Sequence, residues 1–191
     1  MPCAACGKGR PGKKAVNAGD LVQQLSLPQP GEWGPSLWTI LHVAAERAGR
    51  NPIPMLQADE VRELEMLVRS FPMTLPCATC QQHAGEYLRT HPINWKGASG
   101  EAGTELLRRW FYDFHDHVNR SKDPATESPA YELIPGLYGS YTSLATQSTT
   151  ITNYITMGIN FNIIKHEAGV KFRRHLGALR GFLGLWNLSG V

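Results

Sequence analysis

The chain has 191 residues, of which 42% are hydrophobic and 18% are charged. This composition excludes a disordered polyelectrolyte, and the lack of a run of about 18–20 apolar residues argues against a transmembrane helix. The net charge of +3 is too small to require a nucleic-acid partner. Because the first residues hold no apolar signal core, we expect a cytoplasmic protein that is not secreted.

Charge is unevenly distributed along the chain. Residues 1–20 carry four Lys or Arg against one acid, residues 21–132 carry ten against fourteen, and residues 133–191 carry five against one. Basic ends can contact nucleic acid, anionic lipid or acidic proteins, or they can be solvated tails. The composition leaves these alternatives open.

The predicted elements begin after a glycine- and proline-rich stretch, residues 1–31, which we expect to be a flexible basic arm. Apolar spacing then predicts four helices, near residues 34–48, 59–71, 77–89 and 104–121, the second capped by Asp59. Short connections between helices are typical of a bundle, so the predicted fold class is mainly α. Residues 123–150 receive no assignment, residues 151–164 are either strand or loop, and residues 167–187 are predicted to be helical.

The four cysteines form two CxxC pairs, Cys3/Cys6 and Cys77/Cys80. This spacing suits half of a zinc site or a thiol–disulfide pair. The second pair lies at the start of a predicted helix, where the helix dipole favours a thiolate. A thioredoxin-like protein would place the motif after a strand, and here both flanks are predicted to be helical.

Two further pairs have the spacing of one helical turn. Trp38 and His42 lie on the first predicted helix, and His115 and Asn119 lie on the fourth, so the members of each pair share a face. We predict that the rings of Trp38 and His115 sandwich an aromatic ligand. His42 and Asn119 would then hydrogen-bond its polar edge.

Three segments together resemble one family. They are Trp33–His42 (WGPSLWTILH), Leu75–Cys80 (LPCATC) and Trp110–Asn119 (WFYDFHDHVN), and they resemble the Erv/ALR family of FAD-dependent sulfhydryl oxidases in order and rough spacing. The Trp-Gly-Pro opening is most similar to members from large DNA viruses. The resemblance covers residues 32–123, which we therefore expect to be an FAD-binding domain of four helices plus a short fifth.

The resemblance implies a role for each site residue. Cys77 would exchange with the substrate thiol, and Cys80 would face the flavin. The implied FAD-binding residues are Trp38, His42, Trp110, His115, Asn119, Arg120 and Lys122. No metal is implied; electrons would pass from a protein dithiol to Cys77–Cys80, to FAD and to oxygen, which yields hydrogen peroxide.

The resemblance also implies partners and a compartment. Cys3 and Cys6 would shuttle electrons to the core, often that of the other subunit of a homodimer. The expected setting is the cytoplasm, in the viral case that of the host, or the virion. Residues 124–191 match nothing in the family; they are either a packing extension or a region that contacts a partner or a membrane through Lys171, Arg173, Arg174 and Arg180.

The sequence departs from the family pattern at two places. Asp116 stands where the family usually has Asn, and the cysteine pair that often staples the C-terminal region is missing. Two rival functions follow from the same residues. Cys3, Cys6, Cys77 and Cys80 could ligate one zinc ion, or the bundle could serve as a non-catalytic adaptor.

Overall fold

The computed structural model describes residues 28–122 and 124–185, and every regular element in those two ranges is helical. The predicted mainly α class is therefore confirmed for this part of the chain. The α-helices are α1 (Pro30–Arg47), α2 (Pro54–Ser70), α3 (Ala78–Thr90), α4 (Gly100–Arg120), α5 (Ile134–Tyr138), α6 (Ala145–Asn160) and α7 (His166–Phe182). Short 3₁₀ turns lie between them: η2 (Phe71–Thr74), η3 (Trp95–Gly97) and η4 (Tyr131–Leu133).

Several helices begin earlier than the sequence pattern predicts. α1 begins at Pro30 and α2 at Pro54 because proline fits the first turn of a helix, where its missing N–H would be unpaired anyway. Asp59 is consequently not the cap of α2. It lies inside the helix and pairs with Arg62 at 2.9 Å. α4 likewise begins at Gly100 rather than near residue 104.

Residues 151–164, for which the sequence left strand and loop as alternatives, are mostly helical. They belong to α6 as far as Asn160. Ile151 and Ile155, one helical turn apart, are both buried, so the β-branched side chains serve as one packed face of a helix. Tertiary packing thus overrides their usual preference for strands.

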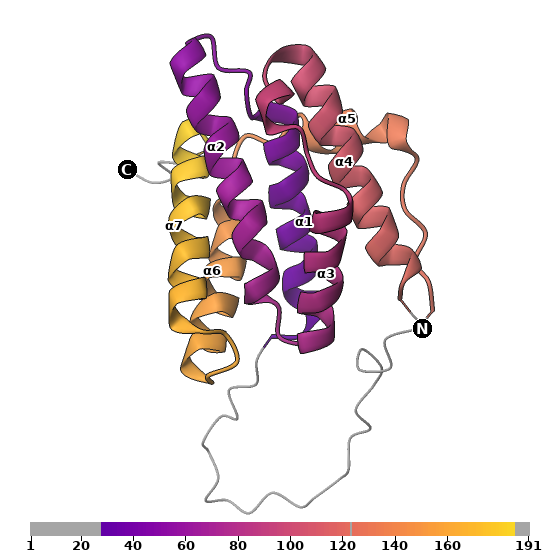
Figure 1. Ribbon diagram of the computed structural model, residues 1–191, viewed down its shortest axis with the longest axis vertical. Helices are drawn as coiled ribbons and strands as arrows, with labels where there is room; N and C mark the ends of the chain where they lie inside the picture. Colours follow the sequence, from indigo (N-terminus) through magenta and orange to yellow (C-terminus); the bar gives the residue numbers. More distant parts are fainter. Residues whose placement is uncertain (1–27, 123, 186–191) are drawn as a thin grey trace, which may run out of the picture.

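The helices form one bundle with α1 near its centre (Figure 1). α1 packs against α4 and against α6, while α7 packs along α2. Buried residues of α1, α2, α4, α6 and α7 belong to a single core cluster, in which Ile40, Leu64, Leu107, Ile155 and Leu179 are each at most 1% exposed. The last two helices therefore share the core of the first four.

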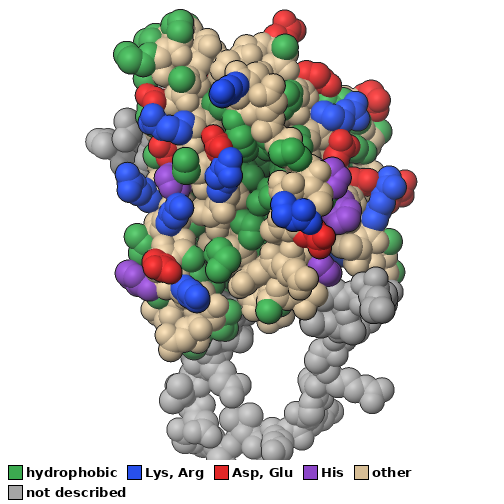
Figure 2. Space-filling view, viewed as in Figure 1, with side chains coloured by type: hydrophobic (Ala, Val, Ile, Leu, Met, Phe, Trp, Pro, Cys, Tyr) green, Lys and Arg blue, Asp and Glu red, His purple; other side chains and the backbone are tan. Residues whose placement is uncertain are grey.

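No helix in the described ranges is both long and apolar enough to cross a bilayer. Lysine and arginine side chains alternate with acidic ones on the face seen in Figure 2, so this face carries no broad patch of one sign. Apolar side chains gather along its middle, between α2 and α3.

Candidate functional site

A disulfide joins Cys77 to Cys80 at the beginning of α3, with 5.2 Å between the Cα atoms. Cys77 is the N-cap of the helix, and its Sγ accepts a hydrogen bond from the backbone N–H of Cys80 at 3.0 Å. Both cysteines are half-buried. Backbone N–H groups at a helix start stabilise a thiolate, so a reduced Cys77 would be held in its reactive form.

The two sulfurs have different surroundings. Cys80 packs against the hydrophobic core, whereas Cys77 precedes the first turn of α3. The side chain of Gln81 donates to the carbonyl of Leu75 at 2.8 Å and so ties α3 to the segment before the disulfide. The sulfur of Cys77 therefore lies where the backbone enters α3, and the sulfur of Cys80 lies nearer the hydrophobic core.

The three ring residues of the two predicted pairs come together. The rings of Trp38 on α1 and His115 on α4 are stacked, with centroids 4.0 Å apart and planes 9° apart. His42 Nε2 and His115 Nδ1 lie at hydrogen-bond distance, 3.0 Å. Trp38, His42 and His115 thus form one compact ring cluster between α1 and α4.

Burial keeps both imidazoles neutral. Desolvation lowers the pKa of His42 to about 4. Desolvation also lowers the pKa of His115 to about 3, with further contributions from His42 and from the ammonium of Lys122. At neutral pH one ring of the pair therefore donates the shared hydrogen bond and the other accepts it.

The predicted sandwich does not have the geometry expected from the sequence. Trp38 and His115 touch each other directly, and a third ring between them would require about twice the separation. Because their inner faces are in contact, a ligand could stack only on an outer face of the pair. His42 Nδ1 is buried and has no hydrogen-bond partner among the described residues, so a ligand with a polar ring edge would satisfy it. The cluster fits a planar heteroaromatic group such as a flavin or an adenine.

The polar residues predicted at the far end of α4 are engaged within the chain. Asn119 is buried; its amide donates to Ser128 at 3.0 Å and accepts from Lys122 Nζ at 2.7 Å. Arg120 is largely exposed and pairs with Asp116 at 2.7 Å. Lys122 thus lies beside the predicted site, whereas Arg120 is directed toward solvent.

Trp110 belongs to a second group of rings. Its indole N–H donates to the carbonyl of His91 at 2.6 Å, and its ring meets that of Tyr87 at 5.6 Å. Phe114 joins the two groups, because its ring contacts Trp38 at 5.4 Å, Tyr87 at 4.6 Å and Trp110 at 5.4 Å. Aromatic packing is therefore continuous from α1 across α4 to α3.

Sequence reasoning missed Tyr87 and Tyr138. Tyr87 lies two helical turns after Cys80, a spacing that places both on one face of α3 and could have identified it. Tyr138, on α5, stacks on His42 with a centroid distance of 4.5 Å. It lies outside every motif considered above, so no local signal marks it.

The remaining features concern the zinc alternative and the cavities of the bundle. Cys3 and Cys6 lie outside the described residues, and no group of three potential metal ligands gathers within the described ranges. A hollow of about 420 Å³, lined in part by Arg47 and Arg50, lies at the other end of α1 from the disulfide. In the disulfide form, Cys77 and Cys80 present no thiolate to a metal.

These features define a helical protein with a CxxC disulfide at the start of one helix and a ring cluster between two others. The comparisons with known proteins agree with that class. Residues 35–130 match the Erv1 / Alr family. The chain belongs to this family. No solved structure matches the chain.

Similar proteins come from viruses and from yeast. The chain is 37% identical over 90 residues to a "Putative FAD-linked sulfhydryl oxidase 096R" of Invertebrate iridescent virus 3, covering 47% of this chain and 55% of that protein. It is 32% identical over 91 residues to "Putative FAD-linked sulfhydryl oxidase 347L" of Invertebrate iridescent virus 6, covering 47% and 78%. It is also 30% identical to "Mitochondrial FAD-linked sulfhydryl oxidase erv1" of Schizosaccharomyces pombe over 100 residues, covering 52% and 50%. The chain thus spans about half the length of the first and third of these relatives.

Proposed function

We propose that this protein is an FAD-dependent sulfhydryl oxidase that forms disulfides in protein substrates. The observation that carries the proposal is the Cys77–Cys80 disulfide at the start of α3, in a family domain that also brings Trp38, His42 and His115 together. The names of the relatives support FAD as the cofactor.

The first chemical step is thiol–disulfide exchange. A substrate thiolate attacks Sγ of Cys77, the bond to Cys80 breaks, and Cys80 leaves as a thiolate. The second substrate thiol, once deprotonated, attacks the mixed disulfide at the substrate sulfur and releases Cys77. The substrate then holds a disulfide, and the enzyme holds two thiols that have taken up its two electrons.

The cofactor would be held by the residues of the ring cluster and the end of α4. Trp38 and His115 would offer an outer ring face, His42 Nδ1 a polar contact, and Lys122 a charge for a phosphate. Asn119, Trp110 and Arg120 complete the proposed set, Arg120 after turning from Asp116. When bound, FAD supplies the oxidation of the dithiol and the reduction of oxygen to hydrogen peroxide.

The wider assignments are part of the same proposal. Residues 32–123 would be the catalytic domain and residues 124–191 an extension, and Cys3 and Cys6 on the arm, residues 1–31, would relay electrons from protein substrates. Homodimerisation and a place in the cytoplasm or the virion are further proposals that follow from the family resemblance. Light scattering of the purified protein at several concentrations tests the dimer.

An absorption spectrum followed by oxygen uptake with dithiothreitol tests the function. We expect a flavin spectrum and thiol-dependent oxygen uptake, which Cys80→Ser abolishes. Thr79→Ser, between the two cysteines, is the matched control and should retain the activity. Cys3→Ser with Cys6→Ser should spare dithiothreitol oxidation and slow oxidation of a reduced protein. A protein that binds no flavin after refolding with FAD, or that holds one zinc ion per chain, would refute the proposal.

A further inference from the structure

The segment in front of the disulfide is held by a residue that lies far away in the sequence. The hydroxyl of Tyr154, on α6, donates a hydrogen bond of 2.6 Å to the backbone carbonyl of Thr74. Thr74 ends η2 and is followed by Leu75, Pro76 and Cys77. Tyr154 lies beyond the part of the chain, residues 35–130, that matches the family.

Tyr154 is itself held firmly in place. Its side chain is 2% exposed, and its ring stacks on Trp33 of α1 with centroids 4.5 Å and planes 17° apart. Burial raises the pKa of the phenol, so the hydroxyl stays protonated and remains a donor. Thr74 is also buried. Removal of the Tyr154 hydroxyl would therefore leave the Thr74 carbonyl without this hydrogen bond in a place that water does not reach.

The position of Thr74 is transmitted to Cys77 by a short stiff link. Leu75 has an extended backbone, with φ −74° and ψ 144°, as the following Pro76 requires. Pro76 has its own φ fixed by its ring. With both linking residues restricted, a shift of Thr74 moves Cys77 and the geometry of its Sγ at the N-cap of α3.

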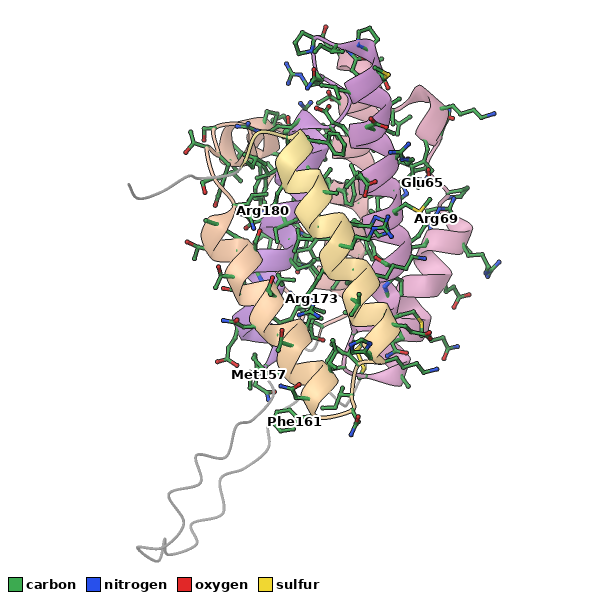
Figure 3. The ribbon with its side chains drawn as sticks, turned by 90° about the vertical axis from the view of Figure 1, so that its left-hand side faces the viewer. Glu65, Arg69, Met157, Phe161, Arg173 and Arg180 are labelled. Carbon is green, nitrogen blue, oxygen red and sulfur yellow. A yellow bond between two sulfur atoms is a disulfide. The ribbon has the colours of Figure 1, made fainter. Side chains whose placement is uncertain are left out.

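α6 is rigidly supported by α7. Gly158 and Gly169 allow the two helices and their connecting turn to approach closely, because a Cβ on either would lie within 2.6 Å of an isoleucine side chain. On α7, Arg173 donates to Thr156 of α6 at 3.1 Å, and His175 contacts Glu63 of α2 at 2.7 Å. Figure 3 shows α7 lying alongside α6, with Arg173 at their junction. The helix pair α6–α7 is therefore a firm support for Tyr154.

We propose that Tyr154 is a positioning residue for the redox disulfide, and that the helix pair α6–α7 sets the reactivity of Cys77–Cys80 through it. This inference rests on the proposed thiol oxidase function. It gives the C-terminal extension, residues 124–191, a role in the reaction. Tyr154 is not part of residues 35–130, which match the family. The hydroxyl of Tyr154 keeps Cys77 close to Cys80 in the reduced form, which raises the effective concentration of one thiol at the other.

The test is Tyr154→Phe, which keeps the ring on Trp33 and removes only the hydroxyl. The first measurement is the equilibrium of Cys77–Cys80 with glutathione, in which two glutathione thiols become one glutathione disulfide and the enzyme disulfide becomes a dithiol. We expect the variant to favour the dithiol about tenfold more than wild type. The second measurement is kcat/KM for dithiothreitol, which we expect to rise while flavin content is retained, because a less stable disulfide is reduced more readily.

Two controls separate positioning from general stability. Ile151→Val removes one methylene from the buried face of α6, one turn before Tyr154, and touches no hydrogen bond to η2. It should leave both measurements at wild-type values. Gln81→Met removes a second side-chain hydrogen bond to this segment, so its effect on the equilibrium should be less than additive with that of Tyr154→Phe.

A wild-type equilibrium and a wild-type kcat/KM in Tyr154→Phe would overturn the inference, as would equal changes in Ile151→Val. Fully additive effects of Tyr154→Phe and Gln81→Met would also overturn it. The glutathione equilibrium needs neither flavin nor oxygen. It therefore tests the positioning role even in a protein that fails the oxygen-uptake test of the proposed function.

Discussion

The buried histidine pair predicts a loss of stability in mildly acidic solution. The pKa of His42 is lowered from 6.5 to about 4 by burial, so the folded protein resists binding a proton that the unfolded chain accepts below pH 6.5. A folded-state pKa below the unfolded value means that stability falls as the pH falls through this window. The loss levels off only near pH 4.

The size of the effect follows from that shift. Between pH 7 and pH 5, linkage through His42 alone removes about 2 kcal/mol from the free energy of unfolding. His115, whose pKa is also lowered, acts in the same direction. The pair shares one hydrogen bond, so its two contributions are not independent. The ordinary carboxyl pKa near 4 lies below this window, which limits the contribution of acidic groups.

Urea unfolding followed by far-UV circular dichroism at pH 7, 6 and 5 measures this loss. His42→Gln cannot take up the proton, so its free energy of unfolding should change with pH by about 2 kcal/mol less than that of wild type. His83→Gln removes an exposed histidine and should keep the wild-type pH dependence. Equal pH dependence in His42→Gln and wild type would refute the reasoning.

Three other substitutions test the packing and the site. Glu46→Gln disrupts the buried ion pair in which the carboxylate meets Arg108 at 2.5 and 2.7 Å. Thermal melting should show that the free energy of unfolding falls by about 3 kcal/mol or more. An unchanged melting temperature would contradict this expectation. Gly169→Ala places a Cβ 2.6 Å from an isoleucine of α6 and should destabilise the protein by about 1–3 kcal/mol. A Cβ on Gly177 would meet nothing within 4 Å, so Gly177→Ala should stabilise the protein by about 0.5–1 kcal/mol. A stability change of the same sign in both variants would refute the packing argument. Tyr138→Ala removes the ring stacked on His42 and should weaken FAD binding about tenfold, as measured by flavin fluorescence titration. Tyr138→Phe keeps the ring and should keep the wild-type affinity. Equal affinity of the two variants for FAD would exclude a role for the ring.

The sequence by itself predicted the helices α1 to α4 and α7 and most of the ring cluster, whereas α5 and α6 were not predicted. Helical spacing is a local property, so residues one turn apart, such as Trp38 and His42, can be assigned to one face without a structure. The N-terminal position of Cys77 on α3 could also be read locally, since Pro76 precedes it and the apolar pattern follows. Helix starts were less accurate, because Pro30 and Pro54 begin helices before the apolar pattern itself becomes visible.

Only the tertiary structure decided how these pieces meet. The direct stacking of Trp38 on His115, the covering of His42 by Tyr138 and the hydrogen bond from Tyr154 to Thr74 all join residues more than 70 positions apart. Such contacts depend on how whole helices pack, which no local pattern encodes. The sequence therefore predicted which residues would carry the chemistry, whereas only the tertiary structure shows that α6 contacts the segment before the disulfide.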